Sequence, residues 1–385
     1  MTPGVLPLPP PIVPLRRVTP TTLLTAKKCR LQAVWSAARQ SPFLPLPAEA
    51  AVGRVIHRVM EGVRRVRVAT REGFDGLWVQ ALDEEEERLS KSWFEKHLVP
   101  LSRSIRDYEQ RRELCWIAVR SMTPTAPLQN YASQSHLHRG TEVWVETPDG
   151  SCAGRIDAVK VSKDGVELID YKSSPVFPLD NNGVGGEDIE AYSFQLKFYA
   201  ALYQARYGTW PRSLKIVANG GRSLEIPFTH TECTAHLKSA YKTLSRINCI
   251  IRSSGLTSKQ TVSAQLASPT SQNCAYCSYR PVCAPYLQTC ARAPAVEGRW
   301  PLDICGKVVE TGFWGQNQVY LDIALEGADT KVRVINLTPN RHPALHQAPQ
   351  WVFIFSLSPF RRSSDVFQEG KYTAIYQTKT IPSHG

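Results

Sequence analysis

Several features that mark other classes of protein are missing from this chain of 385 residues. No stretch approaches the roughly 20 consecutive apolar residues that a membrane-spanning helix needs. Residues 1–14 are rich in proline and have no continuous apolar core, which excludes a secretory signal peptide and predicts a flexible or extended tail over residues 1–17. Internal repeats are absent as well. A membrane protein and a secreted protein are therefore not expected, and we place the protein in the cytoplasm.

Acidic residues are too few to balance the basic ones. Lys and Arg number 46 against 34 for Asp and Glu, which leaves a formal net charge of +12 and a sequence pI near 9.3. A surplus of this size favours a polyanionic partner, with nucleic acid ahead of a membrane surface, although it can also serve solubility alone. The hydrophobic share of 42% and the charged share of 21% are those of an ordinary globular protein with two or three domains.

Helices and strands alternate over most of the chain, which predicts a mixed α/β fold. Thr19-Pro20 begins the first helix as N-cap and first-turn residue. The acidic run Asp83–Glu87 is expected on a solvated helix face. Helices are predicted over residues 19–38, 48–68, 77–98, 187–207 and 231–251, and strands over residues 143–145, 155–162, 166–172 and 213–218.

The chain is predicted to form only strands beyond a boundary near residues 291–298. Five short strands are typical of a small closed or half-closed barrel, and we expect an OB-like domain over residues 295–385. From Lys331 onward, seven basic residues outnumber two acidic ones, and seven aromatic residues lie among them. Such a surface can stack single-stranded bases, with Arg361 and Arg362 as contacts in a loop; alternatively, the rings fill the barrel interior. The strands are expected over residues 302–310, 319–325, 331–337, 350–356 and 372–377.

Two carboxylates and a lysine are predicted to meet on a hairpin of the α/β region. Asp170 and Lys172 lie two residues apart on one strand, so their side chains point to the same face. A two-residue turn at Asp164-Gly165 places Asp157 opposite Lys172, at a Cβ separation of about 5 Å. A turn of four residues preserves the shared face, and a turn of three residues breaks it.

This combination of side chains suits the hydrolysis of a phosphodiester. Carboxylates hold Mg²⁺ or Mn²⁺ through hard oxygen ligands. The metal lowers the pKa of a bound water and neutralises charge on the phosphate. The lysine orients the attacking water and stabilises the charge that develops on the phosphoryl group. The alternative is an ordinary surface ion pair, which contributes little to stability.

Three motifs, in this order along the chain, resemble those of the RecB-like PD-(D/E)XK nucleases. That group includes the nuclease domains of bacterial recombination helicase–nucleases and the small CRISPR-adaptation nucleases. The resemblance covers about residues 18–290 and implies a restriction-endonuclease-like core, a mixed sheet flanked by helices, over residues 18–294. The motifs are Gly154-Arg155-Ile156-Asp157, Ile169-Asp170-Tyr171-Lys172-Ser173-Ser174 and Gln195-Leu196-Lys197-Phe198-Tyr199-Ala200.

The resemblance implies roles for individual residues. Asp157, Asp170 and Lys172 would form the catalytic centre, and the main-chain carbonyl of Tyr171 would be a further metal ligand. Glu142 lies where many members carry an additional acidic residue, although a glutamate at the start of a strand is often only a surface residue.

Two helix motifs add further candidates. His57, at the end of Gly53-Arg54-Val55-Ile56-His57, resembles the family's histidine ligand to the metal. Gln195 and Tyr199 resemble the QxxxY element, which lines the active site and contacts DNA. Outside the family, a histidine on a half-apolar helix and an aromatic stripe at helical spacing are more often core residues, as we expect for Tyr192.

The ten cysteines are expected to be thiols or metal ligands, because disulfides are rare in a reducing compartment. Cys274, Cys277 and Cys283 form a compact set whose spacing fits a soft metal or an iron–sulfur cluster. The resemblance to the iron–sulfur subgroup implies Cys29 as the fourth ligand of a [4Fe–4S] cluster that staples the two ends of the nuclease domain. The alternative is Zn²⁺ with Cys290 as the fourth ligand.

These features together predict a metal-dependent deoxyribonuclease, an exonuclease that acts on single strands or DNA ends in repair, recombination or defence. No GxxxxGK[ST] motif is present, so ATP-driven unwinding would come from a helicase partner. Two alternatives remain: a non-cleaving nucleic-acid-binding protein of the same fold, and a structural subunit of a larger repair or defence complex.

Overall fold

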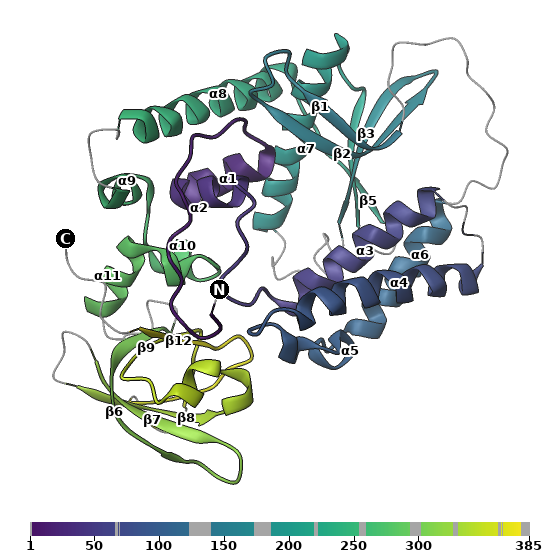
Figure 1. Ribbon diagram of the computed structural model, residues 1–385. Helices are drawn as coiled ribbons and strands as arrows, with labels where there is room; N and C mark the ends of the chain where they lie inside the picture. Colours follow the sequence, from purple (N-terminus) through teal and green to yellow (C-terminus); the bar gives the residue numbers. More distant parts are fainter. Residues whose placement is uncertain are drawn as a thin grey trace.

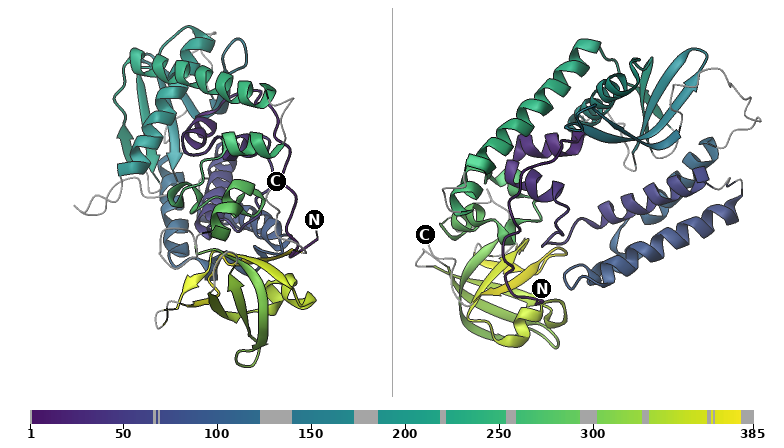
Figure 2. Two further views of the ribbon diagram at one scale, coloured as in Figure 1. Left: turned by 90° about the vertical axis from the view of Figure 1, so that its left-hand side faces the viewer. Right: turned by 45° about the horizontal axis from the view of Figure 1, so that its top comes forward.

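The computed structural model describes most of the chain in one mixed α/β structure with two separate β sheets (Figure 1). The two sheets lie at opposite ends of the molecule in every view (Figure 2). None of the helices within the described residues combines the length and apolar character needed to cross a membrane. The described residues are 2–65, 68, 70–122, 140–172, 186–218, 222–253, 259–292, 302–325, 330–360, 363 and 365–378.

The first sheet contains five strands in the order β1-β2-β3-β4-β5. Its neighbours are antiparallel except β3 and β4, which are parallel and are joined through helix α7 (Gly186–Tyr207). A parallel pair needs such a crossover, because a short turn cannot return the chain to the same end of the sheet. The strands are β1 (Gly140–Glu146), β2 (Ala153–Ser162), β3 (Gly165–Lys172), β4 (Ser213–Ala218) and β5 (Ser223–Glu225).

Helices cover both faces of this sheet. Leu168 belongs to the core shared with α7 and α8 (His230–Ser253). Its neighbour Ile169 belongs to a second core, shared with α3 (Ala48–Arg65), α4 (Arg71–Ser90) and α6 (Tyr108–Met122). Successive residues of a strand point to opposite faces, so β3 is buried on both sides.

The helix predicted over residues 19–38 is two helices, α1 (Pro20–Lys28) and α2 (Arg30–Ala37). Thr19 is the N-cap of α1, as predicted, and its hydroxyl accepts a hydrogen bond from the Thr22 amide. The break falls at Cys29, whose backbone is extended (φ −153°, ψ 116°). Cys29 therefore occupies a joint between two helices rather than the middle of one.

The prediction that the run Asp83–Glu87 lies on a solvated helix face is wrong for its central residue, Glu85. Glu85 is fully buried between α3 and α4. Three guanidinium groups, from Arg54, Arg58 and Arg88, lie 2.7–3.0 Å from its carboxylate. A buried carboxylate must be paired, and here the surrounding arginines satisfy that requirement.

The C-terminal strands form the second sheet, in the order β10-β11-β8-β7-β6-β9-β12. The fourth long strand, β9, returns to lie beside the first, β6, which is the Greek-key order. The five predicted strands are present. Of the buried rings, only Phe367 belongs to the core within this sheet, whereas Phe353, Phe355 and Tyr376 belong to a cluster shared with Tyr286 and Leu287. The strands are β6 (Ile304–Phe313), β7 (Val319–Leu325), β8 (Lys331–Leu337), β9 (Trp351–Phe355), β10 (Ser358–Pro359), β11 (Val366–Gln368) and β12 (Ala374–Thr378).

Short elements join the two parts of the molecule. The proline-rich N-terminal segment is extended and reaches the second sheet, where Val5 forms a parallel bridge with Gln377. A shared core cluster combines Tyr286 and Leu287 with rings of the second sheet. The remaining helices are α5 (Leu101–Ser104), α9 (Lys259–Leu266), α10 (Ser271–Cys274) and α11 (Ala284–Arg292), with 3-10 turns at Lys96–Leu98, Arg280–Val282, Pro339–Arg341 and Pro343–Gln347.

Candidate active site and cysteine cavity

The β2–β3 hairpin brings the predicted carboxylates together in a register different from the predicted one. Ser162 pairs with Gly165, so the turn is Lys163-Asp164 rather than Asp164-Gly165. The register is therefore shifted by two residues, and the ladder ends at the pair Ala158 and Ile169. Because the shift is even, the residues beyond this pair keep their faces.

Asp157 is the residue of β2 directly before Ala158, just beyond the last β2–β3 pair. Its Oδ2 atom accepts a hydrogen bond of 2.8 Å from the main-chain amide of Tyr171. The carboxylate thus replaces a main-chain partner at the point where β2 and β3 separate, next to Asp170. This contact ties Asp157 to the strand that carries the other two predicted catalytic residues.

Asp170 and Lys172 form a buried ion pair on β3. The Asp170 side chain is 2% exposed, and the Lys172 Nζ atom lies 2.6 Å from its Oδ2 atom. Burial raises the pKa of the Asp170 carboxyl, against the opposing effect of the Lys172 charge, and the nearby Asp157 carboxylate raises it further. Asp157 and Lys172 are therefore both close enough to act on the ionisation of Asp170.

Gln195 on α7 connects the members of this site. Its Nε2 atom donates to Asp170 Oδ1 at 3.0 Å and to the Tyr199 hydroxyl at 3.0 Å. Its Oε1 atom accepts from Lys172 Nζ at 3.1 Å. The Lys172 ammonium also lies 4.3 Å from the centre of the Tyr192 ring. Tyr192 packs against the core at partial burial, as predicted, and its spacing of three residues from Gln195 also places both on one helix face.

Gly154 allows α7 to approach the sheet. A Cβ atom at this position would lie 2.5 Å from Cε1 of the Tyr199 ring, closer than any real contact. Packing therefore explains why the GxxD motif has a glycine here: the ring of Tyr199 occupies the space that a side chain would need.

Glu142 lies opposite Asp157 in the β1–β2 pairing, between the pairs Thr141–Ala158 and Val143–Ile156. Its backbone has φ 53°, the left-handed region that a glutamate rarely adopts. Its carboxylate contacts Arg155 Nε at 2.6 Å. The structure thus brings Glu142 to the neighbourhood of the predicted catalytic residues, with Arg155 as a partner.

His57 borders the same site from α3. It is exposed and lines a small pocket together with Tyr171 and Lys172. The donor set near the pocket, which consists of carboxylates, a main-chain carbonyl and an imidazole, has the chemistry that Mg²⁺ or Mn²⁺ accepts. In the described part of the chain, no three His, Cys, Asp or Glu side chains are placed close enough to hold a metal ion as they stand.

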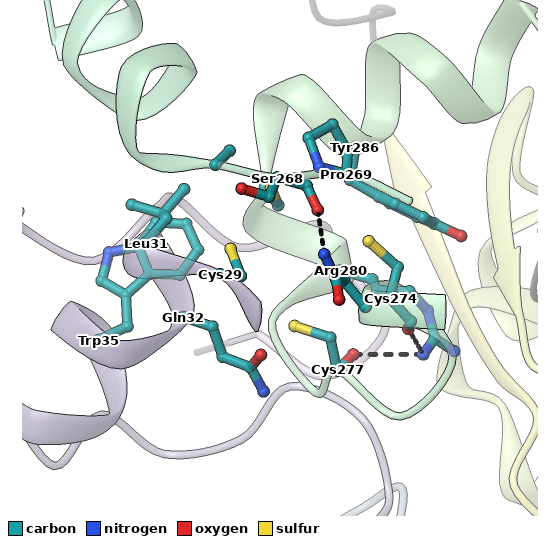
Figure 3. A pocket seen from close by; sticks show the side chains of 13 residues that line it. Cys29, Leu31, Gln32, Trp35, Ser268, Pro269, Cys274, Cys277, Arg280 and Tyr286 are labelled. Carbon is teal, nitrogen blue, oxygen red and sulfur yellow. Dashed lines mark hydrogen bonds between the residues drawn. The ribbon is translucent and has the colours of Figure 1, made fainter. Parts of the chain in front are cut away.

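Four predicted cysteine ligands line one cavity of about 340 Å³, part of it open to solvent. Cys29 comes from the joint between α1 and α2, and Cys274, Cys277 and Cys283 come from the segment before α11. In Figure 3 the sulfur atoms of Cys29, Cys274 and Cys277 face the same space. Thiols are the chemistry that a soft metal group accepts, although among the described residues no three of them stand close enough to hold one. The side chain of Cys290 lies outside the described residues.

Burial sets the ionisation of these thiols. It raises the pKa of Cys274 to about 11 and that of Cys277 to about 12, and the nearby Cys29 thiol acts in the same direction on both. In the metal-free protein the Cys274 and Cys277 thiols are therefore neutral, and binding of a metal must displace their protons.

Arg280 was not recognised from the sequence, although it lies between Cys277 and Cys283. Its buried guanidinium donates to the carbonyl oxygens of Cys274, Ala275 and Cys277 at 2.8–3.2 Å. It also pairs with Asp303, at 2.8 Å, at the start of the second sheet. An arginine inside a cysteine loop was the available signal, because a buried guanidinium needs several acceptors.

The predicted DNA contacts Arg361 and Arg362 lie outside the described residues.

A profile of the family described as the PD-(D/E)XK nuclease superfamily matches residues 17–284. The match includes both sheet-borne carboxylates, the lysine, the α7 glutamine and all four cysteines of the cavity. Comparison with curated proteins gives no match.

Proposed function

We propose, since this chain belongs to the PD-(D/E)XK nuclease superfamily, that it hydrolyses phosphodiester bonds of DNA at the site around Asp157, Asp170 and Lys172. The observation that carries the proposal is the network in which Gln195 holds both the buried carboxylate and the lysine beside it. An ion pair that serves only stability is expected to contribute little, and it does not require a third residue to align both of its members.

Each residue has its own role in the proposed reaction. A Mg²⁺ or Mn²⁺ ion, held by Asp157, Asp170 and the Tyr171 carbonyl, would activate water and neutralise charge on the phosphate. Lys172 orients the attacking water and stabilises negative charge on the phosphoryl oxygens. Gln195 is a positioning residue, because it contacts the carboxylate and the ammonium group rather than the reacting atoms.

We assign His57 and Glu142 as outer members of the metal site. His57 lies on the Tyr171 side of the site, and Glu142 lies opposite Asp157 across the β1–β2 pairing. Their substitution is expected to reduce cleavage less than substitution of Asp170, because the other ligands remain.

We propose that the substrate is DNA with single-stranded regions or free ends, cut exonucleolytically in repair, recombination or defence. The order of the motifs supports the RecB-like group, and the net charge of +12 supports a polyanionic substrate. A helicase partner would supply unwinding. A non-cleaving binding protein of the same fold is the second candidate, but it would not need the aligned lysine.

We propose that the four cysteines hold a [4Fe–4S] cluster in the reducing cytoplasm, as a staple between the N-terminal helices and the segment before α11. The support is their convergence on one cavity. Binding would draw the four thiolates closer together than they stand in the described chain. Zn²⁺ at the same thiols is the alternative.

The nuclease proposal is tested with end-labelled single- and double-stranded DNA and the full-length protein in Mg²⁺ or Mn²⁺. Asp157→Ala, Asp170→Ala and Lys172→Ala should each reduce cleavage by about 10²–10³-fold while DNA binding is retained. Lys160→Ala, an exposed lysine of the same strand β2, is the matched control and should cleave normally. Wild-type turnover by the Asp170 or Lys172 variant contradicts the assignment, and product lengths over time distinguish exonuclease from endonuclease action.

A further inference from the structure

A large groove, distinct from the cysteine cavity, lies between the cysteine segment and the C-terminal sheet, away from the carboxylate–lysine site. Its empty volume is about 970 Å³, part of it open to solvent, which is within the range of ligand-binding clefts. Residues distant in the sequence line it: 44–47, 275–280, 356–358 and 370–372, together with Leu302. None of the described residues that line it belongs to the active site or carries an acidic side chain.

Tyr276 is the most exposed aromatic residue of this groove. Tyr276 lies between Cys274 and Cys277 in the sequence, yet the residue is 85% exposed. The main chain around it is held in place, because Arg280 binds the carbonyl oxygens of Cys274, Ala275 and Cys277. Tyr276 is therefore an aromatic ring on a fixed segment, and it loses little conformational entropy when a ligand covers it.

Tyr372 supplies a second ring with a fixed position. Its hydroxyl accepts a hydrogen bond from the Ala48 amide at 3.2 Å and donates to Glu49 at 3.4 Å. The Lys371 ammonium lies 5.4 Å from the centre of this ring. Arg280 also lines the groove, but Asp303 neutralises it, so Lys371 provides the local positive charge.

We infer that this groove binds unpaired nucleotides of a single strand, with Tyr276 and Tyr372 stacking on bases and Lys371 near the phosphate backbone. An exposed ring on a fixed backbone and a second, hydrogen-bonded ring beside a cation, without a lining carboxylate, are components of sequence-tolerant single-strand binding. A duplex covers the faces of its bases, so stacking selects single strands. The inference rests on the proposed nuclease function and names the place where that enzyme would hold its substrate away from the cutting site.

The test measures the affinity of full-length protein for a short fluorescent oligothymidylate, in EDTA to prevent cleavage. Tyr276→Ala should weaken binding by about 5- to 150-fold, the range expected for one stacked base. Tyr276→Phe keeps the ring and should bind within about twofold of the wild type. Lys371→Gln should lower the salt dependence of binding by about one phosphate contact.

Phe313→Ala is the matched control, because Phe313 is equally exposed (86%) on the hairpin of β6 and β7, outside the groove. Its affinity should equal that of the wild type. An abasic oligonucleotide completes a double-mutant cycle: the effect of Tyr276→Ala should disappear when the bases are absent. An effect that persists on the abasic strand contradicts stacking.

Two further outcomes would overturn the inference. The first is equal affinity of the wild type and Tyr276→Ala for the oligothymidylate. The second is an equal loss of duplex binding in Tyr276→Ala, which would show that unpaired bases are not recognised. Cleavage of the same oligonucleotide in Mn²⁺ is measured in parallel. Wild-type cleavage together with either outcome leaves the nuclease proposal standing, whereas binding without cleavage contradicts the nuclease and not the groove.

Discussion

Asp170 combines deep burial with proximity to a second carboxylate, and this combination links metal binding to pH. Burial raises its pKa above the ordinary value near 4. In the metal-free protein, the free energy of unfolding therefore falls as the pH rises from the ordinary pKa of an aspartate toward the raised pKa of Asp170. A divalent cation that binds the ionised carboxylate removes that cost, so metal affinity should increase over the same pH range.

The first prediction follows from this linkage. Mn²⁺ should raise the melting temperature more in mildly alkaline than in mildly acidic buffer. At a free Mn²⁺ concentration of 100 times its dissociation constant, the stabilisation should be about 2.7 kcal/mol. Asp170→Asn should abolish the rise in melting temperature caused by Mn²⁺ at both pH values. Asp149→Asn, in the exposed turn before β2, is the control and should keep it. Scanning fluorimetry with and without Mn²⁺ measures the shift, and an unchanged shift in Asp170→Asn would refute the linkage.

The second prediction concerns the contact of Gly154 with Tyr199. Gly154→Ala should cost about 1–3 kcal/mol, because the new methyl group overlaps the tyrosine ring. Cleavage should also fall, since Tyr199 is the hydrogen-bond partner of Gln195. Gly76→Ala, in α4, meets no atom within 4 Å and should be neutral or slightly stabilising. Urea denaturation and cleavage rates are compared, and a fully stable, fully active Gly154→Ala would contradict this account.

At the scale of the elements, α3 and α4 are joined by one carboxylate. Burial alone would raise the pKa of Glu85, but hydrogen bonds and charge from Arg54 and Arg88 lower it overall. The stabilisation is therefore present above the ordinary glutamate pKa and is lost as the pH falls through the lowered value. Because α3 also carries His57, this pair of helices positions one border of the proposed active site.

The third prediction is that Glu85→Gln destabilises the protein by about 3 kcal/mol at neutral pH, because it leaves three arginines without their shared carboxylate. The difference from the wild type should shrink in acid, where Glu85 is itself protonated. Glu87→Gln changes an exposed glutamate of the same helix, which pairs with Lys91 at the surface, and should cost less than about 1 kcal/mol. Equal melting temperatures for the two variants would contradict the role of Glu85.

At the scale of the whole molecule, the cysteine segment connects the N-terminal helices with the C-terminal sheet. The cavity joins the N-terminal helices to the segment before α11, and Arg280 joins that segment to the C-terminal sheet through Asp303. The hydroxyl of Tyr286 donates to the same carboxylate at 2.5 Å. A group bound by the four thiols would therefore stabilise contacts between residues that are hundreds of positions apart.

The fourth prediction tests this connection. Protein purified without oxygen should be brown and contain about four irons per chain if a [4Fe–4S] cluster is bound. Cys29→Ser should lower iron content and melting temperature together. Cys249→Ser, which changes an exposed cysteine of α8, should alter neither. A colourless protein with one zinc, retained in Cys29→Ser, would instead favour Cys290 as the fourth ligand.

Much of the fold and of the candidate site could be predicted from the sequence, because those features depend on local patterns. Alternation along residues 166–172 places Asp170 and Lys172 on one face whatever the neighbouring strand does. The spacing of Gln195 and Tyr199 places both on one side of a helix. Thr19 caps its helix through a contact three residues away.

Only the tertiary structure decided which residues meet across the chain. The β2–β3 register depends on which residues form the turn, and a two-residue shift leaves the side-chain pattern unchanged, so the pattern could not distinguish the two registers. Glu85 can be buried because arginines on another helix pair with its carboxylate. Arg280 and Asp303 pair across 23 positions, and no local period records such a contact. The sequence determined which side chains share a face, and long-range packing determined what each face meets.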